Sequence, residues 1–305
     1  MVGSAISKDL ISRFHDWEIV GTSSKEVNLL DQAESKKFVS GFKPDIAILC
    51  AARVGGVQSN FMYPASFALE NQTMQMNSLN ALVQTKVKKI VFMGSACVYP
   101  KNAPLPLVTD SLFGGQLEET NKWYAMAKLA MISALDAVNI QYGIEVCSVL
   151  PANLYGPNDN FHDQDGHVIP SLLMRAHKAK VEQRDELIVW GTGSPQREVL
   201  FIEDLAEAVG IVLNSQNVPK VLNIGSGEER SIKEIATAVC KTVGFHGEIN
   251  FDPSKPDGIL RKPTDNSYMT SLGWSPRYNL ETGLAKTYQW LRSNIDGLRA
   301  KGVLD

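Results

Sequence analysis

The chain has 305 residues, of which 44% are hydrophobic and 21% are charged, proportions that are ordinary for a soluble globular protein. Its net charge of −3 gives no electrostatic reason to expect nucleic acid or an anionic membrane surface as a partner. No apolar stretch reaches the roughly 18 residues that a membrane span needs, and the first ten residues lack the basic and apolar regions of a secretion signal.

Short apolar runs alternate with longer stretches of helical spacing through the first half of the chain. Four runs predict strands buried on both faces: 17–22, 45–52, 89–95 and 145–150. Three segments between them predict helices: 31–41, 64–87 and 122–142. This alternation predicts an α/β fold with a Rossmann-type, doubly wound parallel sheet. Such sheets bind ligands at the carboxyl ends of their strands, so we expect a site just after Ala52, Ser95 and Leu150.

The second half of the chain is more mixed. It contains predicted strands at 186–190 and 197–202, and predicted helices at 167–180, 203–214, 231–243 and 280–293. We expect a dinucleotide-binding domain over residues 1–165 that also receives 195–225. Residues 166–194 and 226–305 are expected to form a smaller mixed α/β substrate-binding domain at the mouth of the sheet.

The beginning of the chain differs from a typical dinucleotide-binding fold. Such a fold opens with a strand and a glycine-rich turn, whose glycines let the backbone approach the pyrophosphate at a helix N-terminus. Here only Gly3, before a predicted helix that ends near Phe14, could belong to such a turn. These residues alone do not support a cofactor assignment.

Tyr124 and Lys128 (YAMAK) lie four residues apart on a predicted helix and therefore share a face. An exposed tyrosine–lysine pair without a role is the alternative interpretation, because this spacing also occurs by chance. A lysine ammonium beside a phenol lowers a pKa that starts near 10, which would make Tyr124 a proton donor to a carbonyl oxygen that receives hydride. Ser95, at the end of a predicted strand, could donate a second hydrogen bond to the same oxygen.

Ser95, Tyr124 and Lys128 on this scaffold resemble the triad of the extended short-chain dehydrogenase/reductases. Longer motifs, in order over essentially the whole chain, are similar to family members that epimerise and reduce a nucleotide sugar: GSACVYPK, ETNKWYAMAK, PANLYGPNDNF, GHVIPSLL, VWGTGSPQRE and FDPSKPDG. The resemblance implies conversion of GDP-4-keto-6-deoxy-D-mannose to GDP-L-fucose. The implied reaction epimerises carbons C3 and C5 and then reduces C4 with NADPH.

The same resemblance implies that Cys97 and His167 act as base and acid in the epimerisation. Both carbons flank the C4 ketone, whose enolate acidifies their protons. A thiol starts near pKa 8.5 and is a usable base beside a positive charge, and an imidazole titrates near neutrality. Without the motif, Cys97 would be a small buried residue at a strand end and His167 a helix N-terminal residue with no role.

The cysteines of the chain indicate no metal site and no disulfide framework. Cys50, Cys97, Cys147 and Cys240 lie far apart, with neither a CxxC pair nor a zinc-ligand spacing. Reduced thiols in a cytoplasmic protein are the expected state.

The segment Thr22-Ser23-Ser24-Lys25 bears on cofactor choice. NAD enzymes usually place an acid there on the ribose 2′-hydroxyl, whereas hydroxyls and a lysine suit a 2′-phosphate. The residues therefore favour NADP(H), although a polar turn with Glu26 nearby is the alternative. The positions implied to contact the cofactor are Gly3, Ser24, Lys25, Asn28, Leu29, Ala51, Ala52, Gly94, Ser95, Lys128, Pro151, Ala152, Asn153, Leu154 and His167.

Five residues match positions that the family uses for the nucleotide sugar: Arg175, Trp190, Arg197, Lys255 and Asp257. Two arginines are suitable clamps for a diphosphate, and an indole can pack on a ring. Each residue alone has an ordinary surface or core explanation, and guanine recognition does not follow from them. The family also implies a homodimer, for which the predicted helices 64–87 and 122–142 are the candidate interface.

One departure from the family pattern and two alternatives qualify this interpretation. Relatives carry roughly a dozen residues before the position of Met1, which form a central first strand and two phosphate-loop glycines. We expect that strand to be missing, with weak cofactor binding and poor stability if the chain starts at Met1. The alternatives are another nucleotide-sugar epimerase or dehydratase of the superfamily and a non-catalytic dinucleotide-binding protein. Ala96-Cys97 fits neither enzyme class, and the five catalytic candidates together argue against a non-catalytic role.

Overall fold

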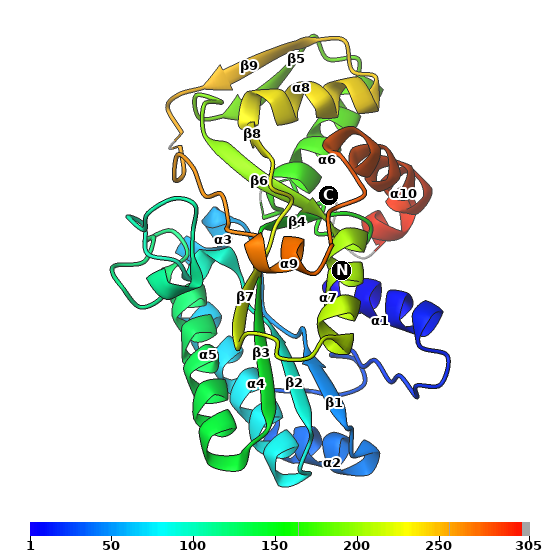
Figure 1. Ribbon diagram of the computed structural model, residues 1–305. Coiled ribbons are helices and arrows are strands. Elements are labelled where there is room, and N and C mark those ends of the chain that lie inside the picture. Colours follow the sequence, from blue (N-terminus) through cyan, green and yellow to red (C-terminus); the bar gives the residue numbers. More distant parts are fainter. Residues whose placement is uncertain (164, 256, 301–305) are drawn as a thin grey trace.

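The protein is described by a computed structural model that covers residues 1–163, 165–255 and 257–300. Within these ranges the largest sheet has four strands in the order β1-β2-β3-β7, and all of its pairs are parallel. Its strands are β1 (Ile46–Leu49), β2 (Lys89–Met93), β3 (Glu145–Pro151) and β7 (Val221–Ile224). Figure 1 shows this sheet in the lower half of the molecule between two sets of helices. The predicted α/β fold with a Rossmann-type, doubly wound sheet is confirmed.

Different helices cover the two faces of this sheet. Along β2, Ile90 and Phe92 belong to one core and Val91 and Met93 to another, because successive strand residues face opposite sides. The first core is completed by α2 (Gln32–Phe42), α4 (Pro64–Gln84) and α5 (Lys122–Tyr142), and the second by α1 (Val2–Arg13) and α7 (Ile202–Asn214). Burial on both faces explains the nearly continuous apolar sequence of β2.

The predicted strand at 17–22 is not formed, and this prediction was wrong. The segment is irregular and largely exposed, with Val20 at 47% exposure. A strand needs a neighbour to accept and donate its backbone hydrogen bonds. In the described structure β1 pairs only with β2, and a cavity of about 2050 Å³ is lined by residues of β1 and by residues 16–24 and 26–30. The segment therefore lacks a pairing partner.

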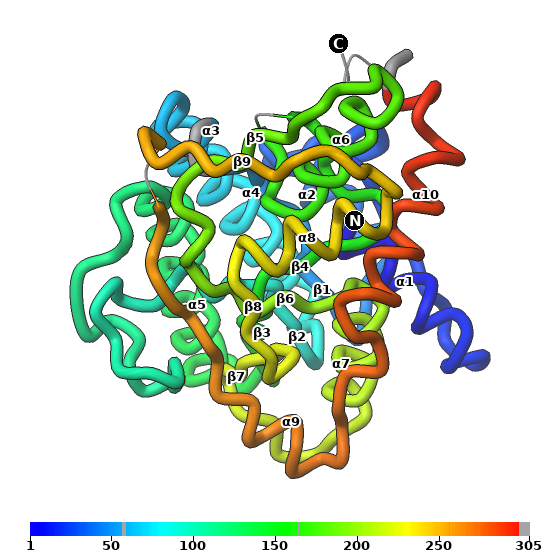
Figure 2. Tube along the Cα trace, turned by 90° about the horizontal axis from the view of Figure 1, so that it is seen from above, coloured from blue at the N-terminus to red at the C-terminus, as the bar shows by residue number. Residues whose placement is uncertain are grey.

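The second region stands on the carboxyl side of the main sheet and has its own core. Strand β5 (Glu186–Trp190) pairs with β9 (Glu248–Asp252), and β6 (Gln196–Phe201) lies between β4 (Asn153–Tyr155) and β8 (Glu229–Ser231). Three helices share this core: α6 (Val168–Val181), α8 (Ile232–Val243) and α10 (Leu280–Ala300). Figures 1 and 2 show α8 beside both α6 and α10. The domain boundaries expected from the sequence stay a prediction.

Helix α8 illustrates how a local signal determines an element's start. Ser231 precedes the helix, and its hydroxyl accepts a hydrogen bond from the Glu234 backbone N–H at 3.1 Å. The Glu234 carboxylate accepts in return from the Ser231 backbone N–H at 2.8 Å. This reciprocal capping box satisfies two amides that the helix itself cannot pair.

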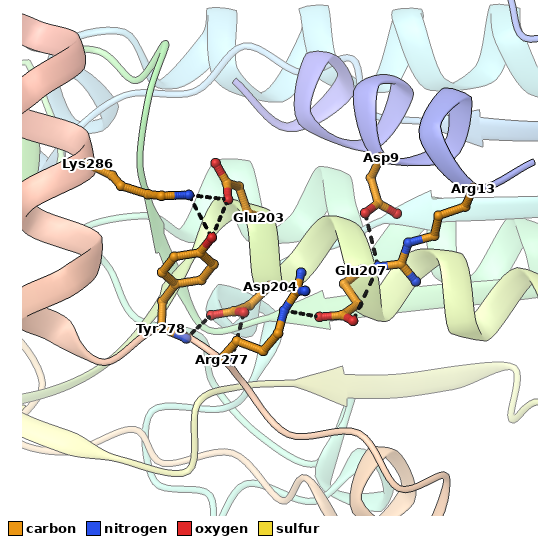
Figure 3. Close-up of polar contacts among 8 residues, drawn as sticks. All are labelled: Asp9, Arg13, Glu203, Asp204, Glu207, Arg277, Tyr278 and Lys286. Carbon is orange, nitrogen blue, oxygen red and sulfur yellow. Dashed lines mark hydrogen bonds and ion pairs between the residues drawn. The ribbon is translucent and has the colours of Figure 1, made fainter.

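Charged residues on α7 connect this region to the main sheet (Figure 3). The carboxylate of Asp204 is fully buried and accepts from the backbone N–H groups of Arg277 and Tyr278, at 2.9 and 3.2 Å. Glu203 accepts from Lys286 of α10 at 2.9 Å, and Glu207 lies 3.4 Å from Arg13 of α1. Helix α7 is thus tied both to α1 and, through the segment before α10, to the second region.

Short elements without a clear periodicity were missed by the sequence analysis. They are α3 (Val57–Met62), β4, β7, β8, β9, α9 (Ser267–Ser271) and the 3₁₀ turns η1 (Ala96–Val98) and η2 (Thr109–Ser111). The longer predicted helices and strands agree with the structure within a few residues, except that α10 extends to Ala300. Among the described residues, no helix is both long and apolar enough to cross a membrane.

Candidate active site

The turn after β2 places Ser95 and Cys97 side by side. Ser95 precedes η1, and its hydroxyl oxygen accepts a hydrogen bond from the Cys97 backbone N–H at 3.2 Å. The preceding Gly94 lies against β3. A Cβ there would be 2.5 Å from Leu150 Cδ2 and 3.0 Å from the Val149 carbonyl oxygen. Close packing therefore accounts for this glycine, and its cofactor contact stays a prediction.

Tyr124 and Lys128 lie one turn apart at the start of α5, as their spacing predicts. The Lys128 ammonium is 5.5 Å from the centre of the Tyr124 ring and 4.6 Å from that of Phe92. It donates a hydrogen bond to the Met93 carbonyl oxygen at 2.7 Å, at the end of β2. Only 2% of the residue is exposed, and this burial lowers the pKa of Lys128 to about 8.

Burial raises the pKa of Tyr124 above its ordinary value, and the neighbouring Cys97 adds to this effect. The expectation that Lys128 lowers the pKa of this phenol is therefore not met. The reason is that Lys128 is itself desolvated and donates to Met93 rather than to the phenol oxygen. Burial therefore disfavours the phenolate form of Tyr124.

The sulfur of Cys97 lies among polar side chains. Its Sγ accepts a hydrogen bond from Asn121 Nδ2 at 3.4 Å. Tyr124, Lys128 and Arg197 all lie within electrostatic reach of the thiol. The structure thus brings Cys97 near the tyrosine and lysine of α5 and near an arginine of β6. Their catalytic roles stay a prediction.

His167 lies at the beginning of α6, and its side chain does not cap the helix. It is exposed, and its electrostatic neighbour is Asp159, which the sequence analysis did not single out. Burial raises the pKa of Asp159, and the charge of His167 opposes that shift. One oxygen of Asp159 accepts from the Asn160 backbone N–H at 2.8 Å, while the other is buried and has no partner among the described residues.

The large cavity beside β1 is lined by several of the residues that were expected to contact the cofactor. Its lining includes Gly3, Ser24, Asn28, Leu29, Ala51 and Ala52. Lys25 is exposed and does not line it. Cys50, which lines the cavity, also lies within electrostatic reach of Lys128, so the cavity adjoins the cluster around Tyr124.

The residues around this cavity fit a dinucleotide. Helix α1 begins at Val2, and the side chain of Met1 makes no capping hydrogen bond to the first amides of α1. The helix dipole there favours an anion such as a pyrophosphate. One oxygen of the Glu26 carboxylate, Oε2, accepts from the backbone N–H and the hydroxyl of Ser23, both at 2.9 Å.

The residues at the junction of β3 and β4 serve mainly as framework in the described structure. Pro151 is the last residue of β3 and lies opposite Ile224 of β7. Leu154 packs into the core below α7, whereas Asn153 is exposed. Their contacts with a cofactor, like that of Ala152, stay a prediction.

Most residues expected on the substrate side lie close together. The Lys255 ammonium is 5.7 Å from the Trp190 ring, and Asp257 accepts from the backbone N–H and hydroxyl of Thr192, at 2.9 and 2.7 Å. Arg197 is within electrostatic reach of both Asp257 and Cys97. Arg175 lies in α6 and donates to the Ile188 carbonyl oxygen of β5 at 2.9 Å.

Arg53 is a further candidate that the sequence analysis missed. It directly follows Ala52 and lines the cavity. Its guanidinium is 3.0 Å from the Glu70 carboxylate and 5.6 Å from the centre of the Phe67 ring. Its position after a predicted strand was the available signal.

A Rossmann-type sheet, a serine at the end of β2 and a tyrosine–lysine pair on α5 define an extended short-chain dehydrogenase/reductase. Residues 1–225 match the model of the NAD dependent epimerase/dehydratase family. The chain belongs to that family and, within it, to the GDP-L-fucose synthases, on the basis of the following similarities.

The chain is 44% identical to GDP-L-fucose synthase 1 of Arabidopsis thaliana, over 97% of this chain and 91% of that protein. It is 42% identical to GDP-L-fucose synthase of Escherichia coli (strain K12), over 98% of this chain and 96% of that protein. Among solved structures, a GDP-L-fucose synthetase from Naegleria fowleri bound to NADP is 27% identical. Its TM-score is 0.87, and the match covers 97% of this chain and 92% of that one.

Proposed function

We propose that the protein converts GDP-4-keto-6-deoxy-D-mannose to GDP-L-fucose by epimerisation at C3 and C5 and NADPH-dependent reduction at C4. The observation that carries the proposal is the position of the Cys97 sulfur, which shares one electrostatic cluster with Tyr124, Lys128 and Arg197. A 4-ketoreductase that does not epimerise needs a proton donor for C4 but no thiol beside it. The similarity to GDP-L-fucose synthases supports the same substrate.

In the proposed epimerisation, Cys97 takes a proton from a carbon next to the C4 ketone and His167 returns one from the opposite face. The enolate oxygen that forms is held by the Ser95 hydroxyl and the Tyr124 phenol. Tyr124 suits this role because its high pKa keeps it protonated and able to donate. Asp159 is placed to stabilise the protonated imidazole of His167.

The same oxygen becomes the hydroxyl group of the product in the reduction. Bound NADPH supplies the hydride to C4. Tyr124 then gives its proton to the oxygen, and the Lys128 ammonium lies 5.5 Å from the centre of the Tyr124 ring. Gly3, Ser24, Asn28, Leu29, Ala51 and Ala52 would hold the cofactor from the cavity, and Arg53 is available to an anionic group there.

The proposal includes two finer points. Exposed apolar side chains on α4 and α5 support a homodimer through these helices: Leu69, Trp123, Met126, Ile140 and Tyr142. Four free cysteines support a reducing, cytoplasmic environment. Arg175, Trp190, Arg197, Lys255 and Asp257 would bind the nucleotide sugar.

One assay tests the proposed function. The protein is incubated with GDP-4-keto-6-deoxy-D-mannose and NADPH, absorbance loss is followed, and the sugar product is identified. We expect GDP-L-fucose from the wild type. Cys97→Ser should form little of it but should still reduce a ketone that is already epimerised. A different sugar product, or normal epimerisation by Cys97→Ser, would contradict the assignment.

A further inference from the structure

Asn121 occupies the position just before the first residue of α5 but does not act as a helix cap. Asparagine is among the preferred residues at this position because its side-chain oxygen can accept from an amide in the first turn. Here its side chain makes no capping hydrogen bond. Instead, Nδ2 donates to Cys97 Sγ at 3.4 Å. The side chain is thus turned away from its own helix and towards the sulfur.

The orientation of the Asn121 side chain also leaves one of its polar atoms without a hydrogen bond. The Oδ1 atom of Asn121 is buried and has no hydrogen-bond partner among the described residues. Buried acceptors are normally paired, since an unpaired one loses its hydrogen bonds to water without replacement. The hydrogen bond to the Cys97 sulfur is the contact that the Asn121 side chain makes in place of a cap.

The other polar groups near the sulfur are engaged elsewhere. Lys128 donates to the Met93 carbonyl, and Arg197 donates to the carbonyls of Gln196 and Ile259, each at 2.7 Å. The Ser95 hydroxyl oxygen accepts from the Cys97 backbone N–H rather than donating to Sγ. In the described part of the chain, the hydrogen bond to this sulfur therefore comes from Asn121.

We propose that Asn121 is a positioning residue for Cys97. Its amide N–H fixes the direction of the sulfur and stabilises the thiolate, which accepts a hydrogen bond more strongly than a neutral thiol does. Lys128 and Arg197 supply positive charge around the sulfur, and Asn121 supplies the directed contact. The importance of this contact for catalysis rests on the proposed function, whereas its effect on the sulfur does not.

The test measures the reactivity of Cys97 directly. Iodoacetamide alkylates the thiolate, and trypsin releases residues 90–101 as a peptide in which Cys97 is the only cysteine, so mass spectrometry follows this site alone. Asn121→Asp is the decisive variant. It keeps the size of the side chain and is an equally good residue at the helix start, but it replaces the donor by a carboxylate.

We expect Asn121→Asp to slow the alkylation of Cys97 about tenfold at pH 7.5 and to move the rate profile to higher pH. Asn121→Ala should slow it by a smaller factor. Asn139→Asp is the matched control, because it adds the same charge on the same helix where Asn139 Nδ2 contacts the Ile144 carbonyl at 2.9 Å. That control should leave the rate unchanged.

Equal alkylation of the wild type and folded Asn121→Asp would overturn the proposal. Circular dichroism shows whether each variant is folded. If a variant does not fold, Asn121→Ser is used in its place, because serine is also a preferred residue at the start of a helix. Cys97 in Asn121→Ser should be alkylated more slowly than in the wild type. The catalytic consequence is tested separately. Asn121→Asp should slow complete fucose formation more than reduction of the epimerised ketone. If Cys97→Ser epimerises normally, the proposed function fails while the alkylation result still decides the role of Asn121.

Discussion

Lys128 lies beneath the candidate site, where its ammonium reaches the Met93 carbonyl and the faces of two aromatic rings. The sequence correctly placed Tyr124 and Lys128 on one helix face, because that depends only on spacing. It could not show that Lys128 donates to the end of β2, since this contact joins residues 35 positions apart. Burial, which is a property of the whole fold, therefore determines the pKa of both residues.

Replacing Lys128 by methionine should stabilise the fold near pH 7 while abolishing activity. The folded-state pKa of about 8 lies below the ordinary 10.5, because burial destabilises the charged ammonium. At low pH, where Lys128 is charged in the folded and unfolded states, this buried charge lowers the free energy of unfolding. From pH 8 to 10.5 the unfolded chain holds a proton that the folded chain has lost, and wild-type stability rises relative to the variant. We expect the free energy of unfolding of Lys128→Met to exceed that of the wild type by about 2 kcal/mol at pH 7. This figure includes the loss of the hydrogen bond to the Met93 carbonyl.

Urea unfolding of both proteins at pH 7, 9 and 10 measures this difference. Groups that do not interact with Lys128 cancel in the comparison, including the Cys147 thiol, whose raised pKa lowers stability at alkaline pH. A variant that is less stable at pH 7, or a difference that does not shrink with increasing pH, would contradict this account of Lys128.

At the scale of single elements, the periodicity of the sequence predicted helices well, whereas strand pairing could not be predicted. The range predicted for α5, 122–142, is the observed one, and the start of α8 follows from the Ser231–Glu234 capping box. The apolar run 17–22 has the composition of a strand but no neighbour to pair with in the described structure. Strand formation depends on a second segment, which local composition cannot supply.

Gly94→Ala tests the packing of β2 against β3. The added Cβ would lie 2.5 Å from Leu150 Cδ2 and 3.0 Å from the Val149 carbonyl oxygen, so the Leu150 side chain would have to move and the β3 backbone would be crowded. We expect a loss of about 2 kcal/mol of unfolding free energy, as for overpacking of a core. Gly41→Ala is the control: it lies in α2 with no atom within 4 Å of its new Cβ and should be neutral or stabilising. Equal effects of the two substitutions would show that the close approach is unimportant.

At the scale of the whole molecule, α7 joins the main sheet to the region that carries Trp190 and Arg197. Figure 3 shows this connection, in which the buried Asp204 carboxylate is held by two backbone N–H groups. No sequence pattern identified it, because Asp204 and its partners are 73 and 74 residues apart. The substrate-side residues were likewise found through the family resemblance and not through composition.

Asp204→Ala should destabilise the protein by about 2–3 kcal/mol, because two buried N–H groups lose their acceptor. Asp136→Ala provides the comparison. Asp136 pairs with Lys220 at 2.7 Å, but both side chains are about half exposed, at 53% and 49%. An exposed pair contributes less than about 1 kcal/mol. Urea unfolding of the two variants should separate them, and a cost for Asp136→Ala as large as that for Asp204→Ala would argue against the importance of the buried connection.

The most direct test of the central claim is hydrogen exchange in the substrate. GDP-4-keto-6-deoxy-D-mannose is incubated with the protein in D₂O without NADPH, and nuclear magnetic resonance follows the protons on C3 and C5. A thiol and an imidazole that exchange protons beside a held C4 carbonyl predict deuterium at both carbons with the wild type. Cys97→Ser should lose this exchange. Unchanged exchange in Cys97→Ser, or no deuterium with the wild type, would contradict the account.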